Sequence, residues 1–463
     1  MLILSINSGS SSVKFMLYDF FKKQALATGS VERIGIGDSF INYHAIDASP
    51  IKIKKECATH KEAIEAFMDT VLDSEIGVLD DLNKINAVGH RVVHGGEKFK
   101  KSVLITPELI QTFKDLYDLA PLHNPPNVAG IEAAMEVFPQ AKHMAILDTA
   151  WHQTMPAHSY MYALPYEWYT DYGIRRYGFH GTSYLYVAKR AALLLGKDPL
   201  KCNLIILHIG NGVSACAVKN GRSYDTSMGL TPLEGLIMGT RAGDHDPAID
   251  FFMMEKENKS PKDMNNILNK NSGILGITGK YTDRRDVENA AEDGDERAKL
   301  AIEMEAYRIR KYIGSYMAAI GGADAIVFTA GVGEMSYVIR EKALQDLEFM
   351  GIKIDLVRNA LARTRNAETA ICTPDSEVKV FVIPTDEERV FIEDVVAILE
   401  NRYDEHTKFR YRFQSPSYVN EQREQEFKKE CRSNPAMRPM QVRPVDYLDE
   451  DVIPDHKITP HTD

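Results

Sequence analysis

The sequence predicts an α/β protein with a duplicated fold, and three observations support this prediction. Apolar runs of strand length alternate with amphipathic helical stretches along most of the chain. The opening stretch, LILSINSGSSSVKFMLYD (2–19), consists of two apolar runs joined by a turn of Asn, Gly and Ser. LIILHIGNGVSACAVKNGRSYD (204–225) repeats this plan. Duplication places one such turn in each half, and a chance likeness of two hairpins is the alternative.

The expected elements follow in chain order from their apolar periodicity. Residues 2–6 and 13–18 are the strands of the first hairpin. KEAIEAFMDTVL (61–72) has its apolar residues on one helical face, which predicts a helix. AVGHRVVHGG (87–96) and HMAILDTA (143–150) are short apolar runs that end in polar turns. Such turns at strand ends are where an α/β fold places its functional side chains.

Two later segments extend the alternation. AIEMEAYRIRKYIGSYMAAIGG (301–322) predicts a long amphipathic helix that two glycines end. AIVFTAGVGEMS (325–336) predicts a buried strand that runs into a glycine loop. After about residue 402 the chain is polar, mixed in charge and dotted with Pro, so residues 403–463 are expected to be a tail that is poorly ordered or wraps the surface.

Composition excludes several functional classes. The chain has 463 residues, a size typical of two or three domains. A net charge of −11 and a pI near 5.8 argue against nucleic-acid binding. Five scattered cysteines without a C-x-x-C pair predict reduced thiols in a cytoplasmic protein. No export signal is recognisable, and no apolar run approaches the roughly 18 residues of a membrane span.

The turn from Asn7 to Ser12 offers hydroxyls and backbone N–H groups, with Lys14 just beyond it. Such a turn suits a phosphate, although an ordinary polar hairpin turn has the same composition. Further polar candidates stand at the ends of apolar runs or in glycine-flanked turns, and each alone has a structural explanation: Arg91, His94, His123, Asp148, Arg175, Arg176, His180 and Arg241. Together they form a set suited to phosphoryl transfer, which needs positive donors around a spreading negative charge.

The motifs in their order resemble the acetokinase family, within the superfamily of acetate and sugar kinases and actin. The resemblance spans about residues 1–400 and is carried by these stretches: INSGSSSVK (6–14), GHRVVHGG (89–96), LHNPPN (122–127), LDTAWHQTMP (147–156), RRYGFHGTS (175–183), HIGNGVSACA (208–217), DTSMGLTPLEGLIMGTRAGDHDP (225–247) and FTAGVGE (328–334). It implies a duplicated actin-like (ribonuclease H-like) fold with two lobes around a central cleft. The implied lobes are residues 1–150 plus 388–402 and residues 151–387, the second binding the nucleotide.

The resemblance also implies an activity. It is the reversible, Mg²⁺-dependent transfer of the ATP γ-phosphoryl group to acetate by direct in-line attack, giving acetyl phosphate and ADP. Mn²⁺ is an expected substitute for Mg²⁺. The implied partners are these small molecules and a second copy of the chain in a homodimer, with neither nucleic acid nor membrane. The implied pathway is acetyl-CoA biosynthesis.

Roles follow from the resemblance by position. The catalytic set is Arg91, His123, Asp148, His180 and Arg241. The metal ligands are Asn7 and Glu387. The first phosphate loop has Ser10, Ser12 and Lys14, and the second has His208, Gly210, Asn211 and Gly212. The adenosine side has Asp283, Arg285, Gly331, Gly333 and Glu334. The acid is bound by Arg91 and a pocket of Val93, Leu122, Phe179 and Pro232.

Two positions depart from the family pattern. Met335 stands where the family has Asn in the adenosine loop, so one nucleotide contact is in question. Asp386 replaces the Asn of the usual T-N-E-E, and its carboxylate either alters the metal site or faces solvent.

Two rivals stay open at this stage. One is a propionate or butyrate kinase, against which Val93 argues because relatives that prefer propionate tend to have a smaller residue there. The other is an actin-like ATPase or nucleotide sensor, which has no need of the Arg, His and Asp set. A purely structural protein is a remote third.

Overall fold

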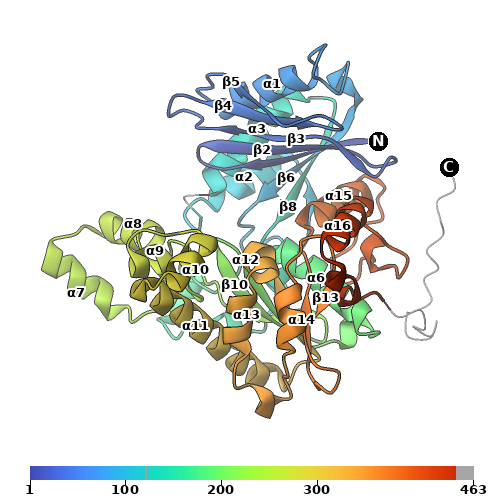
Figure 1. Ribbon diagram of the computed structural model, residues 1–463. Coiled ribbons are helices and arrows are strands. Elements are labelled where there is room, and N and C mark those ends of the chain that lie inside the picture. The colour runs from blue at the N-terminus through green and yellow to red at the C-terminus, as the bar shows by residue number, and fades with distance from the viewer. Residues whose placement is uncertain (121–122, 445–463) are drawn as a thin grey trace. The chain divides into compact units, whose positions relative to one another are not determined.

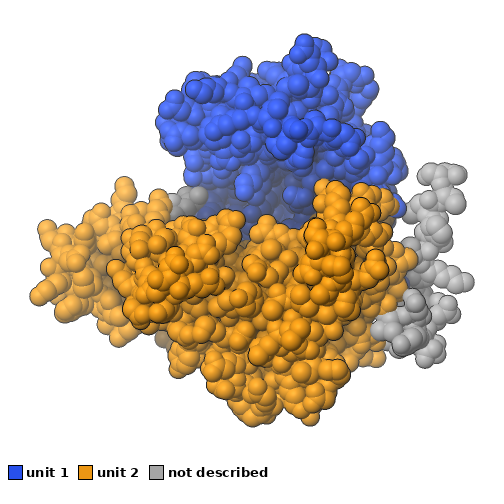
Figure 2. Space-filling model, in the orientation of Figure 1, with its two compact units in different colours: residues 1–153, 387–410 blue, residues 154–386, 411–463 orange. Residues whose placement is uncertain are grey.

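The computed structural model describes residues 1–120 and 123–444. The chain forms two compact units, coloured separately in Figure 2. Unit 1 consists of Met1–Gln153 and Glu387–Arg410, and unit 2 of Thr154–Asp386 and the chain from Tyr411 onward. The chain therefore passes between the units three times, and unit 1 is built from two separate stretches of sequence.

Unit 1 is built on an eight-stranded sheet of order β5-β4-β3-β2-β1-β6-β8-β7. Its strands are β1 (Leu2–Ser8), β2 (Ser12–Asp19), β3 (Gln24–Glu32), β4 (Phe40–Ala45), β5 (Ile51–Lys54), β6 (Ile85–Val92), β7 (Val103–Leu104) and β8 (Lys142–Leu147). Its helices are α1 (His60–Val71), α2 (Pro107–Asp115), α3 (Asn124–Val137) and α15 (Glu387–Leu399), with the 3₁₀ turn η1 (Leu82–Lys84). The 3₁₀ turn η2 (Ala150–Thr154) follows β8.

Side-chain alternation along β1 explains the layers of unit 1. Leu4 and Ile6 point to one face, where they join a core cluster that includes residues of α1 and α3. Ile3 points to the other face and packs with Phe391 and Val395 of α15. Helices therefore cover both faces of the central strands, and α15 does so although it lies far along the sequence (Figure 1).

Unit 2 contains a six-stranded sheet of order β11-β10-β9-β12-β14-β13. The strands are β9 (Leu204–Ile209), β10 (Val213–Lys219), β11 (Arg222–Thr226), β12 (Ala325–Thr329), β13 (Thr369–Ala370) and β14 (Lys379–Val382). The helices are α4 (Ala157–Tyr160), α5 (Tyr166–Tyr172), α6 (Gly181–Leu194), α7 (Ala248–Glu257), α8 (Pro261–Lys270), α9 (Gly273–Thr278), α10 (Arg284–Glu292), α11 (Glu296–Ile320), α12 (Ala330–Met335), α13 (Tyr337–Leu344), α14 (Leu356–Leu361) and α16 (Glu421–Ser433). Short 3₁₀ turns are η3 (Pro199–Lys201), η4 (Glu348–Met350), η5 (Arg412–Gln414) and η6 (Pro435–Met440).

The two sheets share one plan, which confirms the predicted duplication. In unit 1, β3, β2 and β1 are antiparallel, and β6 and β8 continue parallel to β1. In unit 2, β11, β10 and β9 are antiparallel, and β12 and β14 continue parallel to β9. The two similar hairpins of the sequence are thus the first two strands of equivalent sheets.

The segment after β12 differs from the predicted glycine loop. Residues Ala330–Met335 form the short helix α12, and Ala330 enters it with a positive φ of 64°. Two glycines in six residues favour a loop in a sequence pattern, but the helix forms because its backbone packs directly against β9 and β12.

Residues 403–444 belong to the segment predicted to be poorly ordered or to wrap the surface, and few but large apolar side chains anchor them. Tyr411 and Phe413 are fully buried, and Phe427 of α16 is 3% exposed. Phe427 and Cys431 pack against Ala367 in a small core cluster. Residues 445–463 lie outside the described residues.

Within residues 1–120 and 123–444, no helix combines the length and apolar character that crossing a bilayer requires. All five cysteines are thiols outside any disulfide, and their side chains are buried.

Candidate functional site

In unit 1, Arg91 and Asp148 come together at the ends of two neighbouring parallel strands. Arg91 lies near the end of β6, and Asp148 directly follows β8. The Nε of Arg91 donates to Asp148 Oδ1 over 3.0 Å, and its Nη2 donates to Oδ2 over 2.5 Å. The carboxylate of Asp148 raises the pKa of Arg91, and the charge of Glu387 adds to this effect. The guanidinium group is therefore held charged and in a fixed orientation.

Two buried amides, which sequence reasoning did not single out, hold this strand edge together. Asn127 of α3 donates to the backbone oxygen of Ser8 over 2.7 Å and accepts from the backbone N–H of Val93 over 3.0 Å. Asn124 donates to the backbone oxygen of His94 over 3.0 Å. Asn127 therefore ties the end of β1 to the segment after β6. The only sequence signal was that both amides flank two prolines at a helix start.

The turn from Asn7 to Ser12, which is expected to bind phosphate, is narrow and closely covered. The backbone N–H of Gly9 donates to the oxygen of Ser12 over 2.7 Å, while Ser10 and Lys14 are exposed. Helix α3 comes so close that a Cβ at Gly130 would lie 2.0 Å from the hydroxyl of Ser8. The exposed hydroxyl and ammonium groups leave donors available to an anion.

His123 immediately precedes α3 and is half-buried. Its backbone oxygen accepts from the N–H of Asn127, so it belongs to the start of that helix. Leu122 lies outside the described residues.

The residues expected to hold a metal are two oxygen donors in unit 1. Asn7 is the penultimate residue of β1, and Glu387 is the first residue of α15. In the part of the chain that the structure describes, no three His, Cys, Asp or Glu residues are arranged to hold a metal ion. A single carboxylate and an amide still fit Mg²⁺, which keeps several waters and takes substrate phosphate oxygens as ligands.

In unit 2, Arg241 and His180 meet at the turn between β9 and β10. A Cβ on Gly212 would lie 3.6 Å from Arg241 Nη1 and 3.6 Å from His180 Nε2. Arg241 Nη1 donates to the backbone oxygen of Pro232 over 3.3 Å, but none of the ion pairs among the described residues includes Arg241. Burial lowers its pKa from the usual value, and no carboxylate opposes this. A half-buried guanidinium group without a carboxylate is suited to an anionic ligand.

His180 is held from two sides. Its ring stacks on that of His208 at 4.0 Å, and its Nδ1 lies 2.7 Å from the hydroxyl of Ser214. The backbone of His180 has a positive φ of 60° immediately before α6. A left-handed conformation is uncommon for histidine and is often found where a side chain must point at a ligand. The neighbouring Phe179 is buried.

The turn at Gly210–Gly212, the second one expected to bind phosphate, is braced by the loop that carries Arg241. The backbone N–H of Gly210 donates to the oxygen of Gly212 over 3.1 Å, and Gly239 donates to the backbone oxygen of Asn211 over 3.0 Å. A Cβ at Gly239 would lie 2.0 Å from Asn211 Oδ1, so a larger residue there would displace the Asn211 amide. The exposed Asn211 is thereby presented at the tip of the turn.

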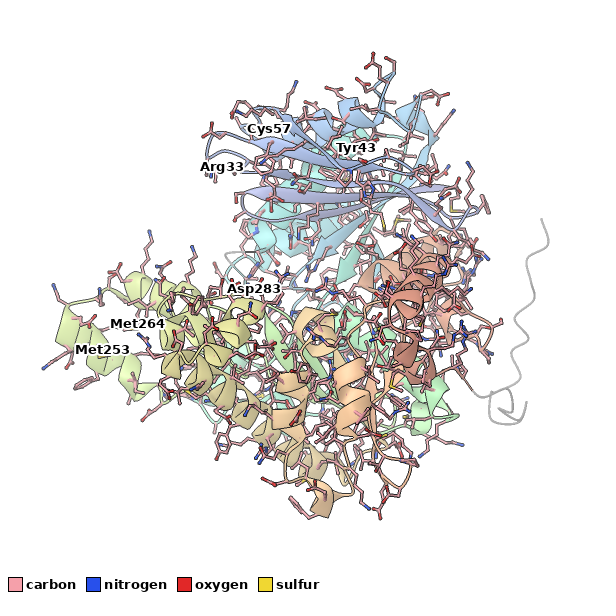
Figure 3. All side chains as sticks on the ribbon, viewed as in Figure 1. Arg33, Tyr43, Cys57, Met253, Met264 and Asp283 are labelled. Carbon is pink, nitrogen blue, oxygen red and sulfur yellow. The ribbon has the colours of Figure 1, made fainter. Side chains whose placement is uncertain are left out.

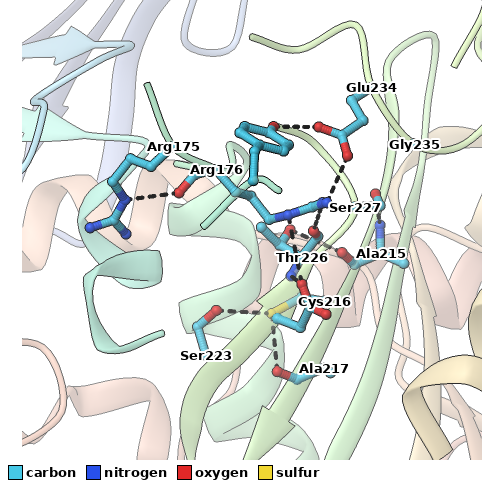
Figure 4. A network of polar contacts seen from close by, with 12 residues as sticks. Arg175, Arg176, Ala215, Cys216, Ala217, Ser223, Thr226, Ser227, Glu234 and Gly235 are labelled. Carbon is cyan, nitrogen blue, oxygen red and sulfur yellow. Dashed lines mark hydrogen bonds and ion pairs between the residues drawn. The ribbon is translucent and has the colours of Figure 1, made fainter. Parts of the chain in front are cut away.

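Arg175 and Arg176, singled out in the sequence beside His180, have structural roles (Figure 4). Arg176 pairs with Glu234 over 2.6 Å and donates to the backbone oxygen of Thr226. Arg175 is 3% exposed and stacks on the ring of Tyr160 at 3.6 Å. Arg176 thereby holds residues 226–234, which precede Arg241 in the chain.

The residues expected on the adenosine side lie at two places in unit 2. Asp283, labelled in Figure 3, caps α10 and pairs with the exposed Arg285 over 2.6 Å. Gly331 and Gly333 belong to α12, as does Met335. Glu334 is buried, which raises its pKa, and accepts from the backbone N–H of Thr385. Glu334 therefore supports the 384–386 segment.

Arg91, Val93 and Asp148 belong to unit 1, whereas His180, Pro232 and Arg241 belong to unit 2. The meeting of these two groups across a cleft stays a prediction.

Comparisons with known proteins show the family to which the chain is similar. The model of the acetokinase family matches residues 2–393. The chain is 60% identical to the acetate kinase of Geobacter metallireducens over 419 residues, which cover 90% of this chain and all of that protein. The crystal structure of Porphyromonas gingivalis acetate kinase is similar with a TM-score of 0.83 and 46% identity, covering 86% of this chain and 99% of that one. The crystal structure of a propionate kinase from Francisella tularensis subsp. tularensis SCHU S4 is similar with a TM-score of 0.78 and 42% identity, covering 85% of this chain and 99% of that one.

Proposed function

Because the chain belongs to the acetokinase family, we propose that it transfers the γ-phosphoryl group of ATP to acetate, giving acetyl phosphate and ADP, in a reversible reaction. An acetate oxygen attacks the γ-phosphorus in line while the bond to the oxygen that bridges the β- and γ-phosphates breaks. The observation that carries the proposal is Arg241, a half-buried guanidinium group without a carboxylate partner beside His180 and a glycine turn.

The donors of unit 2 suit the transferred group. Arg241 and His180 face the same side of Gly212, so both are able to donate to phosphoryl oxygens whose charge grows in the transition state. The bond from Ser214 and the stacking on His208 keep the His180 ring in place. The glycine turn lets backbone N–H groups approach phosphate closely.

The pair in unit 1 suits the acid. Asp148 occupies one edge of the Arg91 guanidinium group and fixes its plane, which leaves Nη1 for the acetate carboxylate. Asn7 and Glu387 would hold Mg²⁺, which neutralises phosphate charge when bound. Exposed Ser10 and Lys14 are able to donate to the nucleotide phosphates.

The second candidate for the acid is propionate, because one similar structure is a propionate kinase. Val93 is half-buried, and its branched side chain supports acetate over longer acids. One methylene group changes discrimination by only about 1–3 kcal/mol, so propionate should be a poorer substrate that is still used.

One assay tests the activity and both rivals. Purified protein is incubated with ATP, Mg²⁺ and acetate, propionate or butyrate, and acyl phosphate is trapped with hydroxylamine as the hydroxamate. We expect hydroxamate from acetate at the highest kcat/KM, with stoichiometric ADP. ADP without hydroxamate would favour a nucleotide sensor, and a preference for butyrate would contradict the acid pocket. Arg241→Ala should lower kcat by about 10³-fold with a smaller change in ATP affinity.

A homodimer is also proposed, with helix α7 of unit 2 in its interface. Ile249, Phe251 and Phe252 on α7 are 51%, 69% and 63% exposed. Met253 lies on the same helix, which extends outward from unit 2 with α8 (Figures 1 and 3). An apolar cluster of this kind is typical of a protein–protein contact. Light scattering should give a dimer for the wild type and a monomer for Phe251→Glu, whereas a monomeric wild type would contradict the proposal.

The cytoplasm is the proposed location, supported by five cysteines that form no disulfide. A part in acetyl-CoA biosynthesis follows from the proposed product.

A further inference from the structure

Residues 411–444, which lie beyond the family's matched residues, fold onto unit 2. The family match ends at residue 393, and the segment 411–444 is well packed. Arg190 of α6 donates to the backbone oxygen of Phe413 over 2.6 Å. Glu430 of α16 accepts from Thr364 over 2.6 Å and from Asn366 over 2.8 Å. These bonds fix α16 on unit 2.

The first turn of α16 contacts the loop that precedes Glu387. Arg423 Nη2 donates to the backbone oxygen of Thr385 over 2.7 Å, and Nη1 donates to that of Pro384 over 3.1 Å. Asn420 caps α16 through its Oδ1, and its Nδ2 donates to the carboxylate of Asp386 over 3.2 Å. A single helix start therefore holds three consecutive residues.

The same loop connects to the stacked rings of His208 and His180. The hydroxyl of Thr385 lies 2.9 Å from that of Ser183, which lies 2.9 Å from His208 Nδ1. His208 stacks on His180. On the other side of the loop, the next residue after Asp386 is Glu387, the expected metal ligand.

We propose that Asn420 and Arg423 are positioning residues that hold the 384–386 loop in register for phosphoryl transfer. They act through Thr385 on the histidine stack and through the chain on Glu387. Asp386 is then the docking carboxylate for α16 and does not bind the metal, which accounts for its departure from the family pattern. The inference rests on the proposed function for its chemistry.

Charge-assisted bonds to backbone oxygens are strong and directional, so their loss should displace the loop. The test compares Arg423→Gln with Arg432→Gln, a matched control on the same helix whose exposed side chain faces away from the core. The readouts are kcat and KM by the hydroxamate assay, and Mn²⁺ affinity in the presence of ADP by electron paramagnetic resonance. We expect kcat to fall about tenfold or more and Mn²⁺ to bind more weakly in Arg423→Gln only, with partial recovery in Arg423→Lys.

The test must separate a lower stability of the protein from a displacement of the 384–386 loop. Phe427→Leu loosens α16 in its core cluster without touching the 384–386 loop, so it should lower Tm and leave kcat and Mn²⁺ affinity near wild type. If Arg423→Gln does not fold, Asn420→Ala replaces it, with the same expected direction and a smaller change.

Two results would overturn the inference. One is that folded Arg423→Gln, or Asn420→Ala in its place, matches Arg432→Gln in kcat and in Mn²⁺ affinity. The other is that Asp386→Asn loses Mn²⁺ binding by more than tenfold, which would make Asp386 a ligand. If the wild type forms no acyl phosphate, the proposed function fails, and the Mn²⁺ measurements still test the positioning.

Discussion

Replacing Gly212 by Ala adds one methyl group at the point where two expected phosphoryl donors meet. The new carbon would lie 3.6 Å from Arg241 Nη1 and 3.6 Å from His180 Nε2, which are ordinary contact distances. Gly212 is absent from the residues with positive φ, so alanine adopts its backbone without strain. The substitution should therefore be accepted by the fold while it fills the space that both donors face.

The magnitude follows from the size of a methyl group. The methyl group has a van der Waals radius of about 2 Å and would keep a phosphoryl group from contacting both donors. A displacement of the phosphoryl group by about 1 Å costs on the order of 10²-fold in rate. This corresponds to about 2.7 kcal/mol of transition-state stabilisation. The free energy of unfolding should rise by about 0.4–1 kcal/mol, because alanine restricts the unfolded chain.

The assay is acetyl phosphate formation, measured together with thermal unfolding. Gly314→Ala in α11 is the matched control, since its Cβ would meet only Met350 Cε at 3.8 Å. We expect both variants to be at least as stable as the wild type and only Gly212→Ala to lose turnover. Turnover of Gly212→Ala within twofold of Gly314→Ala would refute the placement of the phosphoryl group beside this turn.

Three further predictions follow from packing and titration. Gly130→Ala should lower Tm by several degrees, because its Cβ would lie 2.0 Å from the Ser8 hydroxyl. Overpacking of this kind costs about 1–3 kcal/mol of stability. Gly314→Ala, in contrast, should raise Tm. Burial, with the nearby His143, holds the pKa of His90 well below its usual value. The unfolded chain therefore binds the proton first, and the stability of the fold decreases as the pH drops from about 7 towards 5. Tm of His90→Gln should fall less steeply than that of the wild type over this range, and equal slopes of Tm against pH in the two proteins would contradict the prediction. Val93→Ala should raise kcat/KM for propionate relative to acetate, and an unchanged ratio would place the acid pocket elsewhere.

Sequence patterns predicted the duplicated sheets because the relevant signals are local. The turns after β1 and β9 combine glycine with small polar residues between apolar runs, which permits few structures. Arg241 and His180 were also identifiable, since each lies in a glycine-flanked motif. Their meeting at Gly212 needed coordinates, because 61 positions separate residues 180 and 241 in the printed sequence.

The roles of Asn127 and Arg423 could not be predicted from sequence. Each depends on which backbone oxygen lies opposite, and Asn127 reaches a residue 119 positions away. The contacts by which 411–444 packs could not be predicted for a related reason. A few aromatic side chains bury that segment without any apolar period, and composition therefore suggested a tail.

The placement of α15 has a consequence for synthesis on the ribosome. Ile3 and Met144 need Phe391 to shield them from water, yet the 233 residues of unit 2 from 154 to 386 are translated between the two parts of unit 1. At roughly 5–20 residues per second, that interval lasts on the order of 10–50 s. Residues 1–153 of the nascent polypeptide therefore keep an apolar face without its α15 cover for this time, and exposed apolar surface of this kind is what chaperones bind.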